Sequence, residues 1–175
     1  SLEEIDFASK KRAQVLLHMA HAVSQVSDEK FQKELKQVVL ENWNCWEERA
    51  YAAISKFNAR DVADILKAHK MLRIKPSPNF LKPLMARFDI VSQNGNASAT
   101  DYDYVFNAAA KLGFELSPRV QTDFLKRLEK AGSFLRNAKK TPLIWSCAVL
   151  DSMFPTGRYR EIAELIRPHL PKSAY

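Results

Sequence analysis

Glycine is scarce in this sequence, with only four among 175 residues. A sheet-rich fold with many tight turns would use more of them, because glycine readily adopts the positive φ angles that such turns require. No apolar run approaches the roughly 20 residues of a membrane-spanning helix. Cysteine is also rare: Cys45 and Cys147 lie far apart, and neither belongs to a paired metal-binding motif. Free, packed thiols in a reducing compartment are therefore expected.

The sequence also lacks a recognisable catalytic motif. No glycine-rich phosphate loop is present. His18 and His21 have a spacing that can bind a metal on a helix, but no third ligand lies near them in the sequence, so they are expected to be surface or interface histidines. His69 falls on an apolar helical stripe, and Cys147 falls in a dense apolar segment, so both are expected to be packed side chains. We expect neither an enzyme nor a bound metal or cofactor.

Apolar residues make up 46% of the chain, enough to bury a core and to exclude global disorder. The net charge is +7, and the calculated pI is about 9.4. A basic balance of this size favours an anionic partner such as nucleic acid. An ordinary basic surface with no polyanion partner is the alternative.

Two segments of the chain align without a gap, forty residues apart. The matched pairs are Asp61 with Asp101, Ala68 with Ala108, Leu72 with Leu112, Ser77-Pro78 with Ser117-Pro118, and Arg87 with Arg127. Self-similarity at a period of roughly 20–50 residues is typical of repeat arrays. Apolar residues within each segment recur at helical spacing, so each repeat predicts a pair of helices.

We therefore predict an all-α fold, an α-solenoid of about four helix–turn–helix repeats in a single domain, residues 1–175. The repeats span approximately residues 10–41, 58–91, 98–135 and 138–170, with an extra helix near residues 42–57. Helix starts are predicted at polar capping residues and at prolines of the first turn. These are Ser27 or Asp28, Asn58 with Asp61, Ser98 with Asp101, Ser77-Pro78, Ser117-Pro118 and Thr141-Pro142. Gly113 is predicted to end a helix in the left-handed conformation.

Apolar residues at helical spacing also predict which faces are buried. In the first repeat these are Val15, Leu16, Met19, Val23 and Val26, followed by Phe31, Leu35, Val38 and Val39. The extra helix carries Trp43 and Trp46, which are expected to be packing anchors rather than a platform for stacking bases.

Three stretches resemble one helical-repeat family. Val105-Phe-Asn-Ala-Ala-Ala-Lys-Leu-Gly113, followed by Phe114-Glu-Leu-Ser-Pro118, resembles the Leu-Trp-Ala-Leu-Ala-Lys-Leu-Gly core of octotricopeptide repeats, which also look like the repeats of FAST-kinase-like and RAP-domain proteins. Ile144-Trp-Ser-Cys-Ala-Val-Leu150 is similar to the same core and keeps its tryptophan as Trp145. Asp61-Val-Ala-Asp-Ile-Leu66 looks like the start of that helix. The resemblance covers residues 58–166 well and 10–40 weakly.

The resemblance implies an RNA-binding protein of mitochondria or another organelle. Such a protein acts in RNA maturation, stability or translation, and can be a soluble component of a ribonucleoprotein such as a mitochondrial ribosome. The chain departs from the family because Lys67 and Asn107 replace the usual tryptophan. It also shows no RAP domain, which puts any nuclease-like activity in doubt.

Basic residues and exposed first-helix positions are the candidate RNA-binding residues. Lysine and arginine would contact phosphates, and the other side chains would stack on bases or hydrogen-bond to them. The candidates are Lys67, Lys70, Arg73, Tyr104, Asn107, Lys111, Arg119, Lys126, Arg127, Lys130, Arg136, Lys139 and Lys140. Lys10, Lys11 and Arg12 form a further basic cluster. For any one cluster, the alternative is a solvated face balanced by acidic residues.

Two functional classes remain open. The first is RNA binding, alone or within a larger ribonucleoprotein. The second is a protein-binding scaffold or structural subunit with no RNA contact, because helical solenoids also present grooves to peptides. Salt dependence separates the two, since RNA binding weakens steeply with ionic strength as counterions are released.

Overall fold

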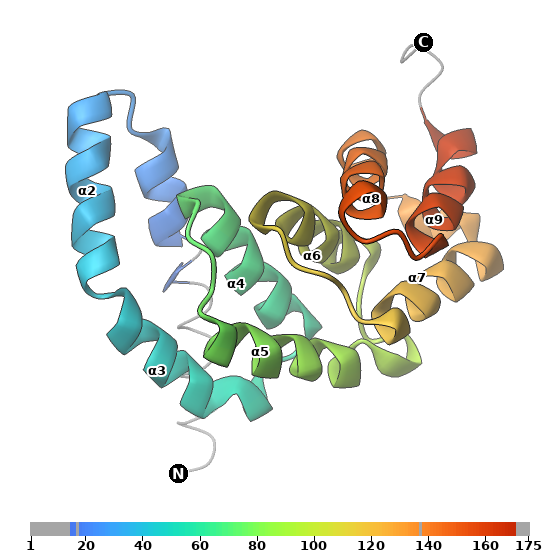
Figure 1. Ribbon diagram of the computed structural model, residues 1–175, viewed down its shortest axis with the longest axis horizontal. Coiled ribbons are helices and arrows are strands. Elements are labelled where there is room, and N and C mark those ends of the chain that lie inside the picture. Colours follow the sequence, from blue (N-terminus) through green and yellow to red (C-terminus); the bar gives the residue numbers. More distant parts are fainter. Residues whose placement is uncertain (1–14, 17, 137, 171–175) are drawn as a thin grey trace. The chain divides into compact units, whose positions relative to one another are not determined.

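The computed structural model describes residues 15–16, 18–136 and 138–170, and these residues form helices joined by turns, with no strand among them (Figure 1). The predicted all-α fold is thus confirmed for this part of the chain. The backbone divides into two compact units, Ser1–Ile90 (unit 1) and Val91–Tyr175 (unit 2). A single solenoid domain running through both units stays a prediction, and the basic cluster at residues 10–12 lies outside the described residues.

Unit 1 holds the first part of the predicted array. Residues 18–25 are helical. The elements that follow are α2 (Glu29–Glu41), α3 (Trp43–Ala53), the short 3-10 helix η1 (Ile54–Lys56), α4 (Ala59–Leu72) and α5 (Pro78–Val91), whose last residue is the first of unit 2. The extra helix predicted near 42–57 corresponds to α3 and η1, and the predicted 58–91 repeat corresponds to α4 and α5.

Unit 2 holds two helix pairs. Its elements are η2 (Gln93–Gly95), α6 (Ala99–Leu112), α7 (Pro118–Lys130), η3 (Gly132–Leu135), α8 (Lys140–Met153), α9 (Arg158–Ile166) and η4 (Arg167–His169). Helix α8 packs along α6, and α9 packs along α7, so the first helices of the two pairs lie together, as do the second helices (Figure 1). Each helix pair buries an apolar face of the other pair, which that pair could not bury alone.

Matching local signals start and end α4 and α6. In both, the N-cap side chain accepts the N–H of an aspartate three residues on, and that aspartate accepts the N–H of the cap: Asn58 with Asp61, and Ser98 with Asp101. These are the predicted capping boxes. Gly113 ends α6 at φ 72°, as predicted. Arg73 ends α4 at the equivalent position and also adopts the left-handed conformation, at φ 55°.

Arginines at matching positions tie α5 and α7 to the chain that precedes α4 and α6. Arg87 Nε donates to the Phe57 carbonyl at 2.7 Å. Arg127 donates to the carbonyls of Ala97 and, at 3.1 Å, Gly95. Its guanidinium also lies over the ring of Phe134, 4.4 Å from the ring centre. The matched arginines in the sequence therefore fix the second helix of each pair against the start of the first.

The core at the N-terminal end of unit 1 is narrower than predicted. Leu16, Ala20 and Val23 are buried against α3 and α4, with Leu35 and Val39 partly buried beside them. Four side chains predicted to face inward are instead exposed: Val15, Met19, Phe31 and Val38. Helix α2 has no fully buried residue among those described. Only a narrow stripe of α2 and of the helix before it packs against the rest of the unit.

The predicted start of α8 was wrong by two residues. Thr141 is not the N-cap: the helix begins at Lys140, after Lys139, whose side chain makes no capping bond. Pro142 is the third helical residue. The earlier start is compatible with this proline, because the first backbone N–H groups of a helix have no partner within it.

Candidate nucleic-acid interface

An exposed tryptophan and a lysine meet on the first helices of unit 2. Trp145, on α8, keeps 41% of its surface exposed. Lys111 is exposed near the end of α6, and its Nζ lies 4.4 Å from the centre of the Trp145 ring. A cation at this distance from a ring is attracted by its π-electrons. The pair thus places an aromatic face and a positive charge together at the surface.

Two further candidates continue this surface along α6. Tyr104, Asn107 and Lys111 follow one another at spacings of three and four, so they share one face of the helix. Tyr104 and Asn107 are half-buried. Asn107 Nδ2 donates to the hydroxyl of Ser146 on α8 at 3.1 Å, and that hydroxyl donates to the Pro142 carbonyl at 2.8 Å. We call Tyr104, Asn107, Lys111 and Trp145 the α6–α8 ridge.

Trp145 is not among the candidate residues predicted from the sequence, although it belongs to a segment that carries the family resemblance. The signal was present in the alignment of the repeats. Trp145 occupies the position that Lys67 and Asn107 occupy in the earlier repeats. Its exposure is a property of the folded chain, since the neighbouring Ser146 and Cys147 are fully buried.

A second basic surface runs along α7. Arg119, Lys126 and Lys130 are exposed and recur at spacings of seven and four, which places them on one side of the helix. Arg127 does not belong to this stripe, because its half-buried guanidinium is bonded to backbone carbonyls within unit 2. The structure therefore gives Arg127 an internal role, and its contact with RNA stays a prediction.

The remaining candidates lie elsewhere on the two units. Arg136 and Lys139 are exposed, and Lys140 is half-buried at the start of α8, the helix that carries Trp145. In unit 1, Lys67 and Lys70 are half-buried on α4, and Arg73 is exposed at its end. The structure thus joins Tyr104, Asn107 and Lys111 in one surface and separates the other candidates into smaller groups.

Unit 1 contains a buried polar cluster centred on Glu47 of α3. Its carboxylate accepts hydrogen bonds from the Ser77 hydroxyl at 2.6 Å, the Ser77 N–H at 3.1 Å and the Trp43 indole at 3.3 Å. His69 Nε2 lies 3.6 Å from the same carboxylate, and His69 Nδ1 lies 2.9 Å from the Ile65 carbonyl. Burial alone would raise the pKa of Glu47, but the nearby His69 and the hydrogen bonds from Ser77 outweigh it and lower the pKa to about 2.

Ser77 and His69 of this cluster do not form a nucleophile–base pair. The hydroxyl of Ser77 bonds to the carboxylate of Glu47 rather than to His69, so the histidine is not placed to take the proton of Ser77. His69 is fully buried and packs edge-on against Trp43, with ring centres 4.8 Å apart. The prediction of a packed histidine is confirmed, as is that of Trp43 as a packing anchor.

Unit 2 has a comparable buried cluster centred on Tyr159 of α9. Its hydroxyl accepts hydrogen bonds from the Leu116 N–H at 3.2 Å and from Gln121 Nε2 at 3.1 Å. Burial raises the pKa of Tyr159 to about 12. Cys147, which lies in the same core, has its pKa raised to about 12 by burial and by the nearby Asp151. Its sulfur therefore remains a thiol, which agrees with the expected core residue.

Within the described ranges, no group of three or more histidine, cysteine, aspartate or glutamate side chains is placed to hold a metal ion. His18 and His21 are both exposed. No helix in the described part of the chain is long and apolar enough to span a membrane.

Comparisons with known proteins return no relative. No family model matches the chain, and neither a curated protein nor a solved structure matches it.

Proposed function

We propose that this protein binds single-stranded RNA through the α6–α8 ridge, as an organellar helical-repeat protein within a ribonucleoprotein. The observation that supports the proposal best is the exposed Trp145 with Lys111 over its ring. Bases of any sequence can stack on an exposed aromatic face, and each such contact is worth roughly 1–3 kcal/mol. An adjacent lysine supplies the charge that a phosphate requires.

Other features of unit 2 are consistent with such a role. Asn107 and Tyr104 carry polar groups beside the tryptophan, and such groups can bond to the edges of unstacked bases. Lys139 and Lys140, at the start of α8, add positive charge to the helix that carries the tryptophan. The stripe of Arg119, Lys126 and Lys130 on α7 offers further phosphate contacts to a longer strand. The net charge of +7 supports association with a polyanion.

The test is a titration of labelled oligouridine with the full chain, followed by fluorescence anisotropy at several salt concentrations. We expect Trp145→Ala to weaken binding about tenfold, the value of one lost stacking contact. Lys111→Gln should reduce the slope of log K against log salt by about 0.7, the share of one phosphate contact. Met153→Ala is the matched control, because Met153 is also an exposed apolar residue of α8.

Two results would exclude this proposal. One is the absence of any oligouridine binding at low salt. The other is equal affinity for the Trp145→Ala and Met153→Ala proteins, which would mean that the ridge is not the contact surface. In either case the protein-binding scaffold becomes the better hypothesis.

The organellar setting is supported by the resemblance to octotricopeptide repeats alone. Fractionation of cells that express a tagged chain tests it directly. Recovery of the protein with organellar RNA after nuclease-free lysis is the expected result, and recovery with proteins alone would contradict the ribonucleoprotein part of the proposal.

A further inference from the structure

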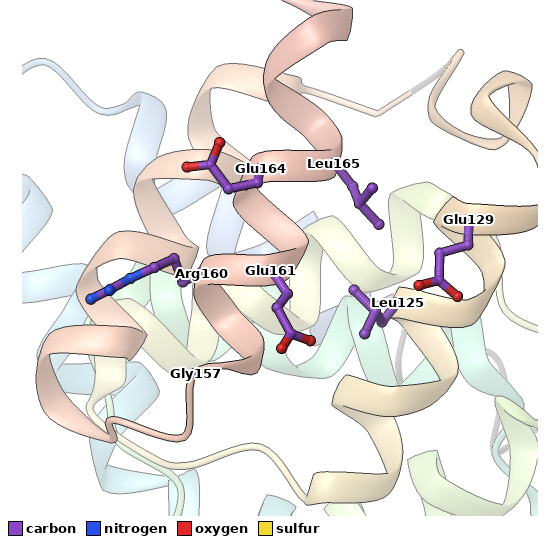
Figure 2. A pocket seen from close by; sticks show the side chains of 7 residues that line it. All are labelled: Leu125, Glu129, Gly157, Arg160, Glu161, Glu164 and Leu165. Atoms are coloured by element: carbon purple, nitrogen blue, oxygen red, sulfur yellow. The ribbon is translucent and has the colours of Figure 1, made fainter.

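A groove lined by apolar and acidic residues, in contrast to the basic surfaces described above, lies between α7 and α9, the second helices of unit 2. Its volume is about 520 Å³, and it is lined mainly by apolar surface. Leu125 of α7 and Leu165 of α9 provide that surface, and Glu129 and Glu161 lie beside it (Figure 2). Glu164 also lines the groove, but its carboxylate points away from the two leucines (Figure 2). The groove is thus an apolar depression with an acidic rim, in a chain whose net charge is +7.

The one cation among the described residues that line the groove is directed elsewhere. Arg160 also lines it, but its guanidinium lies 3.2 Å from Asp151 and points away from Leu125 (Figure 2). Arg167 Nη2 lies 3.1 Å from Glu164 Oε1, so that carboxylate has an ion-pair partner. In contrast, no ion pair among the described residues reaches Glu129 or Glu161. Two carboxylates without such an ion pair therefore line the groove from different helices.

We propose that this groove binds a basic amphipathic helix of a partner protein, which makes it a protein-docking surface separate from the α6–α8 ridge. Leucine-like side chains of the partner would pack between Leu125 and Leu165, and its lysines or arginines would lie over Glu129 and Glu161. Recognition of an amphipathic helix by an apolar groove is a common binding mode. Charge complementarity selects a cationic partner and disfavours RNA, because phosphates would meet the two carboxylates.

The proposal is tested with the full chain and a synthetic probe. The probe is a fluorescein-labelled peptide with leucines at helical spacing and lysines on both flanks, and a peptide of the same composition in scrambled order serves as its control. We expect saturable binding of the ordered peptide, detected by anisotropy. Glu129→Gln/Glu161→Gln should weaken it about tenfold, and Leu165→Ala should weaken it without a change of charge.

A double variant with the same charge change is the matched control. Glu48→Gln/Glu115→Gln removes two exposed carboxylates that do not line the groove, so it should leave peptide binding unchanged. Circular dichroism of each variant verifies that the helices are retained. Oligouridine affinity should not fall in the Glu129→Gln/Glu161→Gln protein, which separates this proposal from that of RNA binding.

Several outcomes would overturn the inference. The first is that the ordered peptide does not bind. The others are that the scrambled peptide binds equally well, or that the control variant weakens binding equally. Either of these two would mean that the peptide binds through general electrostatic attraction. Sedimentation velocity tests whether a second copy of this chain occupies the groove instead. If the chain forms a dimer that Glu129→Gln/Glu161→Gln dissociates, the groove binds a second copy and the partner helix is excluded.

Discussion

The helix pair α4–α5 of unit 1 and the pair α6–α7 of unit 2 have the same local construction but are held by different buried groups. Each pair begins with a capping box, turns at a left-handed residue and restarts at a serine–proline step. In unit 1, the turn before the second helix is bonded to Glu47, which comes earlier in the chain. In unit 2, the equivalent turn is bonded to Tyr159, which comes later.

The difference shows that each repeat encodes where its own helices begin and end. It does not encode which buried group from another helix holds its turn. A turn between two helices leaves backbone N–H groups that need acceptors when they are buried. In unit 1 the acceptor is a charged carboxylate, with a histidine close by. In unit 2 it is a neutral hydroxyl. The two units should therefore respond differently to loss of the acceptor and to pH.

Glu47→Ala should destabilise unit 1 by about 3 kcal/mol, because it leaves the donors of Trp43 and Ser77 without an acceptor. Tyr159→Phe should cost unit 2 only about 1–2 kcal/mol, since the acceptor that it removes is neutral, and hydrogen bonds to a neutral group are weaker than those to a carboxylate. Urea unfolding measures the total loss, and amide hydrogen exchange locates it in one unit. Glu48→Ala, at an exposed neighbouring position, is the control. Equal effects of Glu47→Ala and Glu48→Ala would contradict the role assigned to the buried carboxylate.

Arg127→Ala should cost about 2–3 kcal/mol, and Arg87→Ala about 1–2 kcal/mol. Both lose bonds to backbone carbonyls, but Arg127 makes two of them and also contacts the ring of Phe134. Thermal unfolding by circular dichroism gives the comparison. Lys126→Ala removes a neighbouring exposed charge and should change stability by less than about 0.5 kcal/mol. If Arg127→Ala is as mild as Lys126→Ala, the arginine is not an anchor, and its assignment to RNA gains weight.

Acid should weaken unit 1 through Glu47. Its pKa is about 2 in the folded chain against 4.5 for an unperturbed glutamate. A depressed pKa stabilises the fold above pH 4.5, and this contribution is lost as the pH falls through 4.5 toward 2. With allowance for solvent screening, the loss is on the order of 1–2 kcal/mol. Urea unfolding at pH 6, 4 and 2.5 measures it. The same slope in Glu47→Gln protein would show that other carboxylates cause the effect.

The left-handed residues should give small effects of opposite sign. Arg73→Gly should stabilise unit 1 by about 0.5–1 kcal/mol, because glycine adopts a positive φ without steric cost. Gly113→Ala should destabilise unit 2 by about 1 kcal/mol through its backbone alone, since an added Cβ would meet no atom within 4 Å. Differential scanning calorimetry resolves both. Effects of the same sign would mean that the two turns are not equivalent.

Much of the helical framework could be predicted because helix ends are encoded locally. The caps at Asp28, Asn58 and Ser98 and the turn at Gly113 depend on residues within a few positions of each other. Capping signals were less reliable at Thr141, where a proline is compatible with more than one helix start. The exposure of Phe31 and Val38 was not predictable from their spacing. The periodicity of a helix shows which residues share its apolar face, but not how much of that face another helix covers.

The candidate sites also combine features that could be predicted locally with features that depend on tertiary packing. Lys111 could be selected from its charge, whereas the exposure of Trp145 and its contact with that lysine depend on how α6 and α8 pack. Arg127 and Lys126 are candidates for the same reason, their charge, yet Lys126 is exposed and Arg127 is half-buried. The acidic groove of α7 and α9 joins residues that are more than thirty positions apart, and no local pattern indicated it.

The sequence by itself determined where most of the helices begin and end, and that the same helix pair occurs twice, because capping, proline placement and helical periodicity act over a few residues. Only the tertiary structure decided which polar groups are buried, which cations remain at the surface and which carboxylates share a groove. Those outcomes depend on contacts between helices distant in the chain, where desolvation and hydrogen bonding act on side chains that the sequence does not bring together.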